Sequence, residues 1–414
     1  MIRILDRAGV IFTLSLPLAL LHIRGLAEIL FVVLSVLFLV RSIMLRDATW
    51  LGAWWMRIGL VWWAWLVLCT VLAGGGLGPV VQALGMGRFL LLAMALGHWT
   101  LRDGTIRTWL ARLLRWAALY IGLQSLLQFA VGVNLYGYPR SGDGELTGPY
   151  AHPRAGPPLA RLLFPALLPP LGRLLAGPGW RPVAGAALAV GSVVTMVLIG
   201  QRMPLLLSVF GLFITALLLP RLRGAMFATC IAASLMLTAT SVVSPPAFYR
   251  LVTKFSRQME DFPDSHYGQI AARSLAISAA HPVFGTGFDG FRTGCEQQQY
   301  FVGWHGDDGG AAAMCVQHPH SHYMQALVES GWPGLVLFCA LVLAWLQALG
   351  RGLWRDPTPL RVGIFVAALL HEWPIASTSA FSSMPLSGWF FVLLGLGLAE
   401  TRAYMTAKPV RETV

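Results

Sequence analysis

Runs of about 20 consecutive apolar residues recur along most of the chain, and they constrain its fold more than any other feature. A helix of that length crosses the ~30 Å hydrocarbon core of a bilayer. Hydrophobic residues make up 56% of the 414 positions and charged residues 12%. A soluble domain has roughly 25% charged residues. The sequence therefore predicts an all-α polytopic membrane protein.

We expect about twelve transmembrane helices, the first of them short and either tilted or broken at Pro17. No small-residue cleavage site follows it, so no cleaved signal peptide is predicted. Three regions result: 1–243 with nine spans, 244–332 as an outer loop domain with short helices, and 333–414 with three spans and a tail. The predicted spans are 9–23, 26–42, 58–76, 82–101, 116–133, 158–176, 183–200, 203–219, 224–243, 333–350, 362–379 and 383–400.

The net charge of +12 is explained first by topology. With the amino terminus in the cytoplasm, nineteen of the thirty Lys and Arg residues fall on the inner side, as the positive-inside rule requires. Both termini are then predicted to be cytoplasmic, and no nucleic-acid partner is needed to account for the charge. The other eleven basic residues lie outside or at outer helix ends, where topology does not explain them.

Two polar segments interrupt the apolar pattern, and both are predicted to lie on the outer side. Residues 134–158 are rich in Gly and Pro, which favours an ordered loop. In the second segment, 244–332, "SHYGQIAARSLAISAAHPVFG" predicts a helix that stops at His281-Pro282. Cys295 and Cys315 also lie there, and an oxidising compartment permits a disulfide between them, with two free thiols as the alternative.

The stretch "HPHSH" places His318, His320 and His322 at alternate positions before an apolar run. An extended backbone would let them bind zinc together with Asp307 or Asp308. However, Pro319 favours a turn and "SHYMQALVESGW" the start of a helix, so the His320 and His322 rings should diverge and no metal is expected. The remaining interpretations are general acid or base chemistry and simple anchoring of the helix.

Four segments, in this order, resemble the O-antigen ligase/polymerase superfamily of bacterial envelope glycosyltransferases. They are "ELTGPYAHPRAG" (145–156), "LIGQRMPLLL" (198–207), "HPVFGTGFDGF" (281–291) and "HPHSHYMQALVESGWPGLVLF" (318–338). The family's histidine aligns with His320, and Glu329 and Gly331 match its Glu and first Gly.

The sequence departs from the family pattern at several positions. Where the family usually has Asn, Ser, Gly and Asn, this chain has Ser321, Gln201, Met203 and Arg154. Tyr267 stands where an outer-loop arginine is usual, and Arg273 or Arg257 is the expected substitute.

The resemblance implies a GT-C-like fold, with a large periplasmic loop between the ninth and tenth spans and the active site on the periplasmic face of the bacterial inner membrane. It implies transfer of a glycan from undecaprenyl diphosphate to an acceptor hydroxyl, without cofactor or metal. The acceptor would be a lipid A-core sugar for a ligase, slightly favoured here, or another lipid-linked glycan for a polymerase.

Arginine suits a lipid diphosphate leaving group because its planar fork binds phosphate oxygens in pairs and stays charged. We expect His320 to handle the acceptor proton and Arg202, placed between two spans, to bind the diphosphate. The further substrate-binding candidates are Arg140, Arg154, Arg161, Arg273, Arg292, His318, His322 and Glu329.

His371-Glu372 lies within the predicted eleventh span, either as a functional pair or as a buried pair that joins helices. Two rival functions remain. A lipid-linked glycan transporter would line both leaflets with charge, whereas the unexplained polar residues here gather on one side. A metal hydrolase built on the outer loop is the third possibility.

Overall fold

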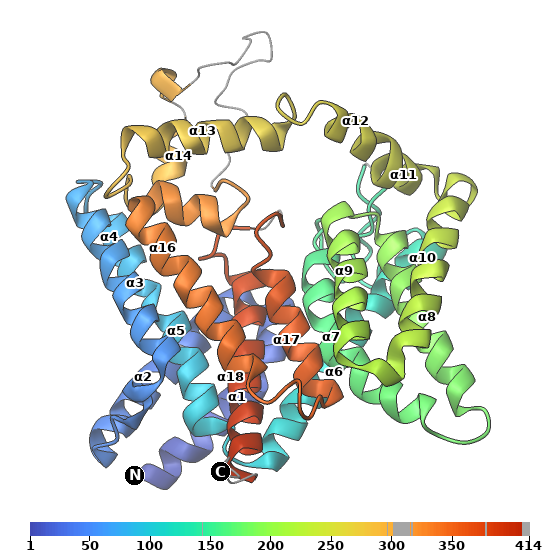
Figure 1. Cartoon of the computed structure of the whole chain (residues 1–414), viewed down its shortest axis with the longest axis horizontal. Helices are drawn as coiled ribbons and strands as arrows, with labels where there is room; N and C mark the ends of the chain where they lie inside the picture. Colours follow the sequence, from blue (N-terminus) through green and yellow to red (C-terminus); the bar gives the residue numbers. More distant parts are fainter. Residues whose placement is uncertain (143, 296, 301–314, 316–317, 377–378, 408–414) are drawn as a thin grey trace.

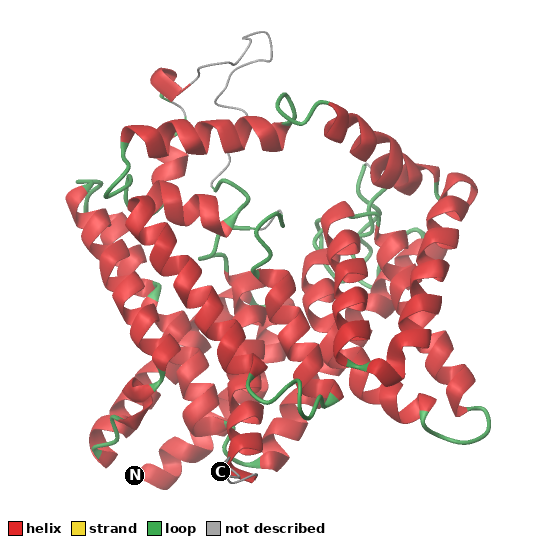
Figure 2. Ribbon diagram, in the orientation of Figure 1, coloured by secondary structure: helices red, strands yellow, loops and turns green. Residues whose placement is uncertain are grey.

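The computed structural model describes residues 1–142, 144–295, 297–300, 315, 318–376 and 379–407. These residues form helices and connecting loops (Figures 1 and 2). No β-strand occurs among them, and their one isolated bridge pairs Val133 with Pro139. The all-helical prediction is confirmed for this part of the chain.

Each predicted span overlaps a helix. These helices are α1 (Ile2–His22), α2 (Arg24–Leu45), α3 (Trp54–Leu72), α4 (Leu77–Gly85) with α5 (Gly87–Ala95) and the π-turn Leu96–Thr100, α6 (Gly104–Val131), α7 (Gly156–Leu175), α8 (Arg181–Ile199), α9 (Arg202–Leu218), α10 (Arg223–Val243), α16 (His322–Gly350), α17 (Pro359–His371) and α18 (Met384–Ala407). By length and composition, eight helical segments in the described residues are able to cross a membrane. α9 and α17 are apolar but shorter.

Two predicted spans need correction. The eleventh, 362–379, was placed too far along the chain, because α17 ends at His371 and Pro374 follows shortly after. His371 and Glu372 therefore lie at the end of a helix rather than in its middle. α1 begins at Ile2 and runs through Pro17 without a break, so it is longer than predicted and not interrupted.

The remaining helices lie together at one end of the bundle. They are α11 (Pro245–Phe248), the π-turn Tyr249–Thr253, α12 (Lys254–Glu260), α13 (His266–Ala280), α14 (Gly290–Gly294) and the short 3-10 turn Gln298–Tyr300 beside α13. Two further 3-10 turns, Thr49–Gly52 and Pro220–Leu222, lie elsewhere. Both chain ends lie at the opposite end of the molecule (Figure 1). Below, "outer" means the end that carries α11–α14. Lys408 and Arg411, two of the predicted inner cations, fall outside the described residues.

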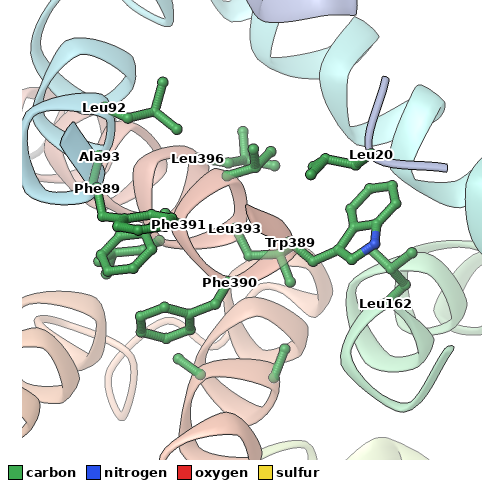
Figure 3. Close-up of a cluster of buried hydrophobic side chains, with 14 of the residues drawn as sticks. Leu20, Phe89, Leu92, Ala93, Leu162, Trp389, Phe390, Phe391, Leu393 and Leu396 are labelled. Atoms are coloured by element: carbon green, nitrogen blue, oxygen red, sulfur yellow. The ribbon is translucent and has the colours of Figure 1, made fainter. Parts of the chain in front are cut away.

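Apolar side chains hold the bundle together around α18. Phe89, Leu162, Trp389 and Phe391 meet Leu20 in a buried cluster that joins α1, α5, α7 and α18 (Figure 3). A second buried cluster links α7 to α8, α9, α10 and α17. α7 packs against members of both clusters, so it connects the two halves of the bundle.

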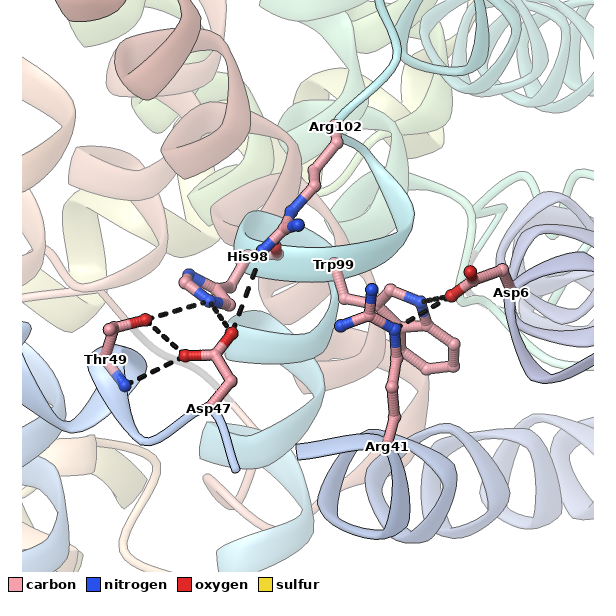
Figure 4. A network of polar contacts seen from close by, with 7 residues as sticks. All are labelled: Asp6, Arg41, Asp47, Thr49, His98, Trp99 and Arg102. Atoms are coloured by element: carbon pink, nitrogen blue, oxygen red, sulfur yellow. Dashed lines mark hydrogen bonds and ion pairs between the residues drawn. The ribbon is translucent and has the colours of Figure 1, made fainter. Parts of the chain in front are cut away.

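The inner ends of the first helices are joined by polar contacts (Figure 4). Asp6 of α1 accepts hydrogen bonds from Arg41 Nε of α2 at 2.8 Å and Trp99 Nε1 at 2.7 Å. Asp47, in the loop after α2, lies 3.2 Å from His98 Nε2. These contacts fix α1, α2 and the π-turn relative to one another.

Candidate functional site

A kink in α16 organises the outer end of the molecule. Ser330 and Gly331 leave the helical conformation, with Gly331 at φ +66°, and separate a short outer helix from the long one below. The loop after α13 fits into this kink. Its backbone bonds are Thr286 N to Val328 O at 2.8 Å, Gly287 N to Glu329 O at 3.0 Å, and Trp332 N to Pro282 O at 2.9 Å.

A side chain at position 331 would collide with this loop, because its Cβ would lie 2.3 Å from the Val283 carbonyl oxygen. Glycine also accepts the positive φ without strain. The segments 281–291 and 318–338, recognised separately in the sequence, are thus one structural unit.

Glu329 and Gln325 fix the short outer helix from inside. Glu329 Oε1 accepts hydrogen bonds from the Asp289 backbone N at 3.0 Å and from Gln325 Nε2 at 2.9 Å. Gln325 Oε1 accepts from the Phe381 backbone N at 2.9 Å. Glu329, predicted to bind substrate, is buried in this network. Its observed contacts hold the helix and the 281–291 loop together.

His320 lies just before α16, where Ser321 caps the helix by accepting from the Met324 N–H. Its φ is +55°, a left-handed conformation that histidine adopts more often than most residues and that costs on the order of 1–3 kcal/mol. The half-buried ring lies 4.5 Å from the His318 ring and 5.6 Å from the Tyr267 ring, between centroids. His320 is therefore held in a strained position on the outer side.

His322 points the other way, into the bundle. Its Nδ1 lies 2.9 Å from Glu372 Oε2 and its Nε2 lies 3.1 Å from the Ser379 carbonyl oxygen. Arg161 Nε of α7 donates to His371 Nδ1 at 2.5 Å. All four side chains are at least 95% buried. The substrate-binding roles expected for Arg161 and His322 therefore do not fit their positions, because both side chains are enclosed between α7, α16 and α17.

Among the described residues, His322, His371 and Glu372 form a group that could in principle hold a metal ion, because one potential ligand atom from each lies within 4.8 Å of the others. The hydrogen bonds argue against its use as a metal centre. Because Arg161 donates to His371 Nδ1, the ring proton belongs on Nε2, which faces Glu372 Oε1 at 3.7 Å. A coordinating nitrogen needs a free lone pair. We interpret these side chains as a hydrogen-bonded network that holds α7, α16 and α17 together.

Arg202 owes its position to a sharp junction. α8 ends at Gly200 with φ +76°, Gln201 is extended, and α9 starts at Arg202. The Gln201 side chain bonds the Gly156 N–H at 3.1 Å and the Pro153 carbonyl at 2.7 Å. Those groups lie on either side of Arg154, which is exposed. The structure thus brings the backbone around Arg154 next to that of Arg202.

Arg202 faces α12 and the start of α13. Its Nη1 donates to Gln258 Oε1. Tyr267, Arg250 and Glu145 lie close enough to act on its charge. Tyr267 thus contacts the ring of His320 and lies close enough to Arg202 to act on its charge.

Arg250 is a residue that the sequence reasoning missed. It forms an ion pair with Glu145 and lies near Arg202. The sequence held one signal for it: Arg250, Lys254 and Gln258 follow one another at intervals of four in a helical segment, which places them on one face.

The other predicted arginines are engaged elsewhere. Arg273 is fully buried and donates to the Cys295 carbonyl at 2.7 Å, beside a disulfide that joins Cys295 to Cys315. Burial lowers its pKa. Arg273 thus does not replace the missing outer-loop arginine as an exposed ligand, which corrects the expectation from the sequence.

Arg140 and Arg292 also have partners of their own. Arg140 donates to the Phe129 carbonyl and lies over that ring, with its Cζ 5.1 Å from the centroid. Arg292 is exposed and pairs with Asp289 at 2.6 Å. Burial raises the pKa of Asp289, and Arg292 opposes the shift. Asp307 and Asp308, considered for a metal site, lie outside the described residues.

Comparison with known protein families matches residues 187–339 to a family described as O-antigen ligase. The match contains three of the four segments singled out in the sequence and leaves out 145–156. No curated protein matches the chain.

Proposed function

Because the chain belongs to the O-antigen ligase family through residues 187–339, we propose that it transfers a glycan from a polyprenyl diphosphate to an acceptor hydroxyl. The reaction takes place at the outer end of the bundle, on the periplasmic face of the bacterial inner membrane. The observation that carries the proposal is the position of Tyr267, whose ring contacts the ring of His320 and which lies close enough to Arg202 to act on its charge.

In the proposed step, the acceptor oxygen forms a bond to the reducing-end carbon of the glycan while the bond from that carbon to the diphosphate oxygen breaks. The acceptor proton passes to His320 and then to water. The leaving group is the lipid diphosphate. General base help of this kind is worth ~100- to 10,000-fold in rate.

Arg202 stabilises the negative charge that grows on the leaving diphosphate, with Arg154 as the adjacent second ligand. Arg250 lies nearby, but its ion pair with Glu145 offsets its charge, so Arg202 and Arg154 are the cations assigned to the diphosphate. Fixed cations of this kind take the place of a divalent metal, so we propose that the reaction needs none. His322, Glu372, His371 and Arg161 act indirectly, by holding α16 and therefore His320 in position.

Ligation to a lipid A-core sugar is the favoured reaction, and polymerisation of lipid-linked repeats is the alternative with the same chemistry. Deletion in the native host separates them by glycolipid gel analysis. Core that lacks all O-antigen indicates a ligase, and core with a single repeat indicates a polymerase.

The chemistry is tested with purified protein in detergent, a polyprenyl diphosphate glycan donor and an acceptor glycolipid. Arg202→Ala should lower transfer by ~100- to 1,000-fold, which is typical for loss of an electrostatic donor. Arg202→Lys should also be poor, since one ammonium does not reproduce a bidentate fork. The matched controls are Arg355→Ala and Arg355→Lys, because Arg355 is an exposed arginine at the inner end.

Full activity of Arg202→Ala would remove Arg202 from the mechanism. Chelator should leave wild-type transfer unchanged. Loss of transfer with EDTA and its recovery with a divalent ion would replace the proposed mechanism with a metal-assisted one.

A further inference from the structure

A second site lies on the other side of the bundle from Arg202. A cavity of about 960 Å³ is bounded by α2, α3 and the α4–α5 segment, with part of the outer loop at its mouth. This volume is at the upper end of the range of ligand pockets, ~300–1,000 Å³. Nothing in the proposed transfer step uses it.

The cavity follows one face of α2 downward from the outer end. Arg24, Glu28, Val32, Ser35 and Leu39 line it at intervals of three or four residues. From Arg24 to Leu39 the helix descends ~22 Å, most of the ~30 Å depth of the hydrocarbon core. The wall is mainly apolar in its lower part, where Leu39 and Leu91 lie. A cavity of this shape suits a long hydrocarbon chain.

The upper part of the cavity is charged. Arg24 and Arg292 line it together with two carboxylates, Glu28 and Asp289, and Arg88 lies deeper, where its carbonyl accepts from the Ser35 hydroxyl of α2 at 3.0 Å. The carboxylates are already paired, Glu28 with Arg24 at 3.4 Å and Asp289 with Arg292 at 2.6 Å. With all five groups charged, the lining carries one positive charge in excess, and Glu28 lies close enough to Arg88 to act on its charge as well.

Arg88 is placed at an unusual depth. It lies near the midpoint of the apolar segment Leu77–Thr100, just after the break between α4 and α5. Its Nη1 donates to the Gly85 carbonyl at 2.7 Å, and its Cζ lies 4.5 Å from the Phe89 ring centroid. Among the described residues, no carboxylate lies within ion-pair distance of it. An arginine at such a depth is costly, and arginines inside membranes pair with a partner or mark a substrate path.

We propose that this cavity binds a phosphorylated membrane lipid, with its phosphate against Arg88 below Arg24 and Arg292 and its hydrocarbon chain along α2. A phosphate supplies the anionic, multidentate acceptor that the Arg88 fork lacks. The lower cavity supplies the apolar contact that a free phosphate ion does not need.

The position of the cavity also suggests the role of the lipid, and this step rests on the proposed function. Asp289 at its mouth bonds through its backbone N–H to Glu329, one of the residues that fix the short outer helix behind His320. Ala380 lines the cavity next to Ser379, whose carbonyl bonds His322. The bound lipid would thus approach His320 from the side opposite Arg202, as the carrier of the acceptor glycan.

The test measures lipid binding without turnover. Purified protein in a non-ionic detergent is titrated with undecaprenyl phosphate, with lipid A and with dephosphorylated lipid A, and native mass spectrometry counts the bound molecules. Arg88→Gln should weaken binding of at least one phosphorylated lipid on the order of 10- to 100-fold, the usual effect of losing a charged hydrogen bond. Dephosphorylated lipid A should bind weakly to every variant.

A pair of matched variants guards against misfolding of Arg88→Gln. Val32→Trp fills the cavity and should lower the number of bound phosphorylated lipids by one, while a lipid at the donor site beside Arg202 remains bound. Val40→Trp lies eight residues further on, about 80° around the same helix and outside the cavity lining, and should bind like the wild type. Both valines are exposed on α2, at 47% and 40%.

Equal lipid binding by Val32→Trp, Val40→Trp and the wild type would overturn the proposal. So would full displacement of the lipid by inorganic phosphate, because the site would then recognise the ion alone. In the transfer assay, Val32→Trp should raise KM for the acceptor and leave KM for the donor unchanged. If lipid binding behaves as expected while Arg202→Ala remains active, the proposed transfer mechanism fails and the lipid site stands.

Discussion

The ring of Tyr267 meets the ring of His320 edge to face, with centroids 5.6 Å apart. Tyr267 stands where the O-antigen ligase/polymerase superfamily usually has an outer-loop arginine. It lies close enough to Arg202 to act on the charge of that residue. An exposed aromatic side chain thus contacts the proposed base and lies near the proposed diphosphate ligand. In the proposed reaction we expect it to orient the His320 ring.

The strained backbone at His320 allows the effect of a variant on stability to be distinguished from its effect on transfer. We expect His320→Gly to be at least as stable as the wild type, because glycine accepts φ +55° freely, and His320→Ala to be slightly less stable than His320→Gly. Both should lose transfer by ~100-fold or more. Thermal unfolding and the transfer assay measure the two effects. Normal transfer in His320→Gly would reduce the histidine to a helix anchor.

The pair His322 and Glu372 should behave in the opposite way. His322→Ala leaves the Glu372 carboxylate buried without its 2.9 Å partner, and breaking such a pair costs ~3–5 kcal/mol of stability. A lower Tm in detergent measures the loss, with His152→Ala at an exposed position as control.

The double variant His322→Leu/Glu372→Leu provides a sharper check. Replacing both partners of a buried pair with apolar residues is often neutral, so this variant should regain most of the lost stability. Stability losses that simply add would show that the two side chains do not act as a pair.

The disulfide between Cys295 and Cys315 closes a loop of 20 residues. In the chain-entropy model such a bridge stabilises by roughly 3 kcal/mol. Thiol labelling of denatured, unreduced protein should therefore mark Cys69, Cys230 and Cys339 only. Labelling of Cys295 and Cys315 without reductant would contradict the bridge.

Acid should weaken the inner end through Asp47. Hydrogen bonds from the Thr49 hydroxyl and N–H lower the pKa of this carboxyl to about 2, from 3.8, against the opposing effect of burial. Because the folded pKa is depressed, its stabilisation is present above pH 3.8 and is lost as the pH falls towards 2. Asp47→Asn should lower the Tm at pH 7, and the difference from wild type should shrink between pH 4 and pH 2.5. A constant difference over that range would assign the effect to packing; Asp261→Asn, at an exposed position, is the control.

Topology is tested by reporter fusions. Fusions after residues 150 and 300 should report the periplasm, and fusions after 110 and 355 the cytoplasm. Both chain ends lie at the end of the bundle opposite α11–α14 (Figure 1), which agrees with this arrangement. A cytoplasmic signal at 300 would place the proposed site on the wrong side for a donor presented outside.

The apolar runs predicted the main helices because length and hydropathy are local properties of the chain. The helix at 266–280 was likewise visible from the spacing of its apolar residues and its stop at His281-Pro282, and the junction before Arg202 from two spans that follow each other without a loop. The partners of Arg161 were not visible, since it meets His371 across 210 positions of sequence. Arg273 is similar: only tertiary packing places it behind the disulfide and not at the surface. A pattern of residue types identified arginines on one side of a membrane, but not the direction in which each side chain points.

The backbone bonds between 282–287 and the kink of α16 determine how the outer end can open. They involve no side chains, and they fasten the carboxyl end of α13 to the helix that carries His320. The connection at its other end is looser, because residues 261–264 between α12 and α13 are exposed. The loop at 282–287 is thus tied to α16 by backbone bonds, whereas α12 joins α13 through the exposed residues 261–264. We therefore expect any movement that admits a donor in the proposed reaction to take place at α11 and α12 rather than where α13 meets α16.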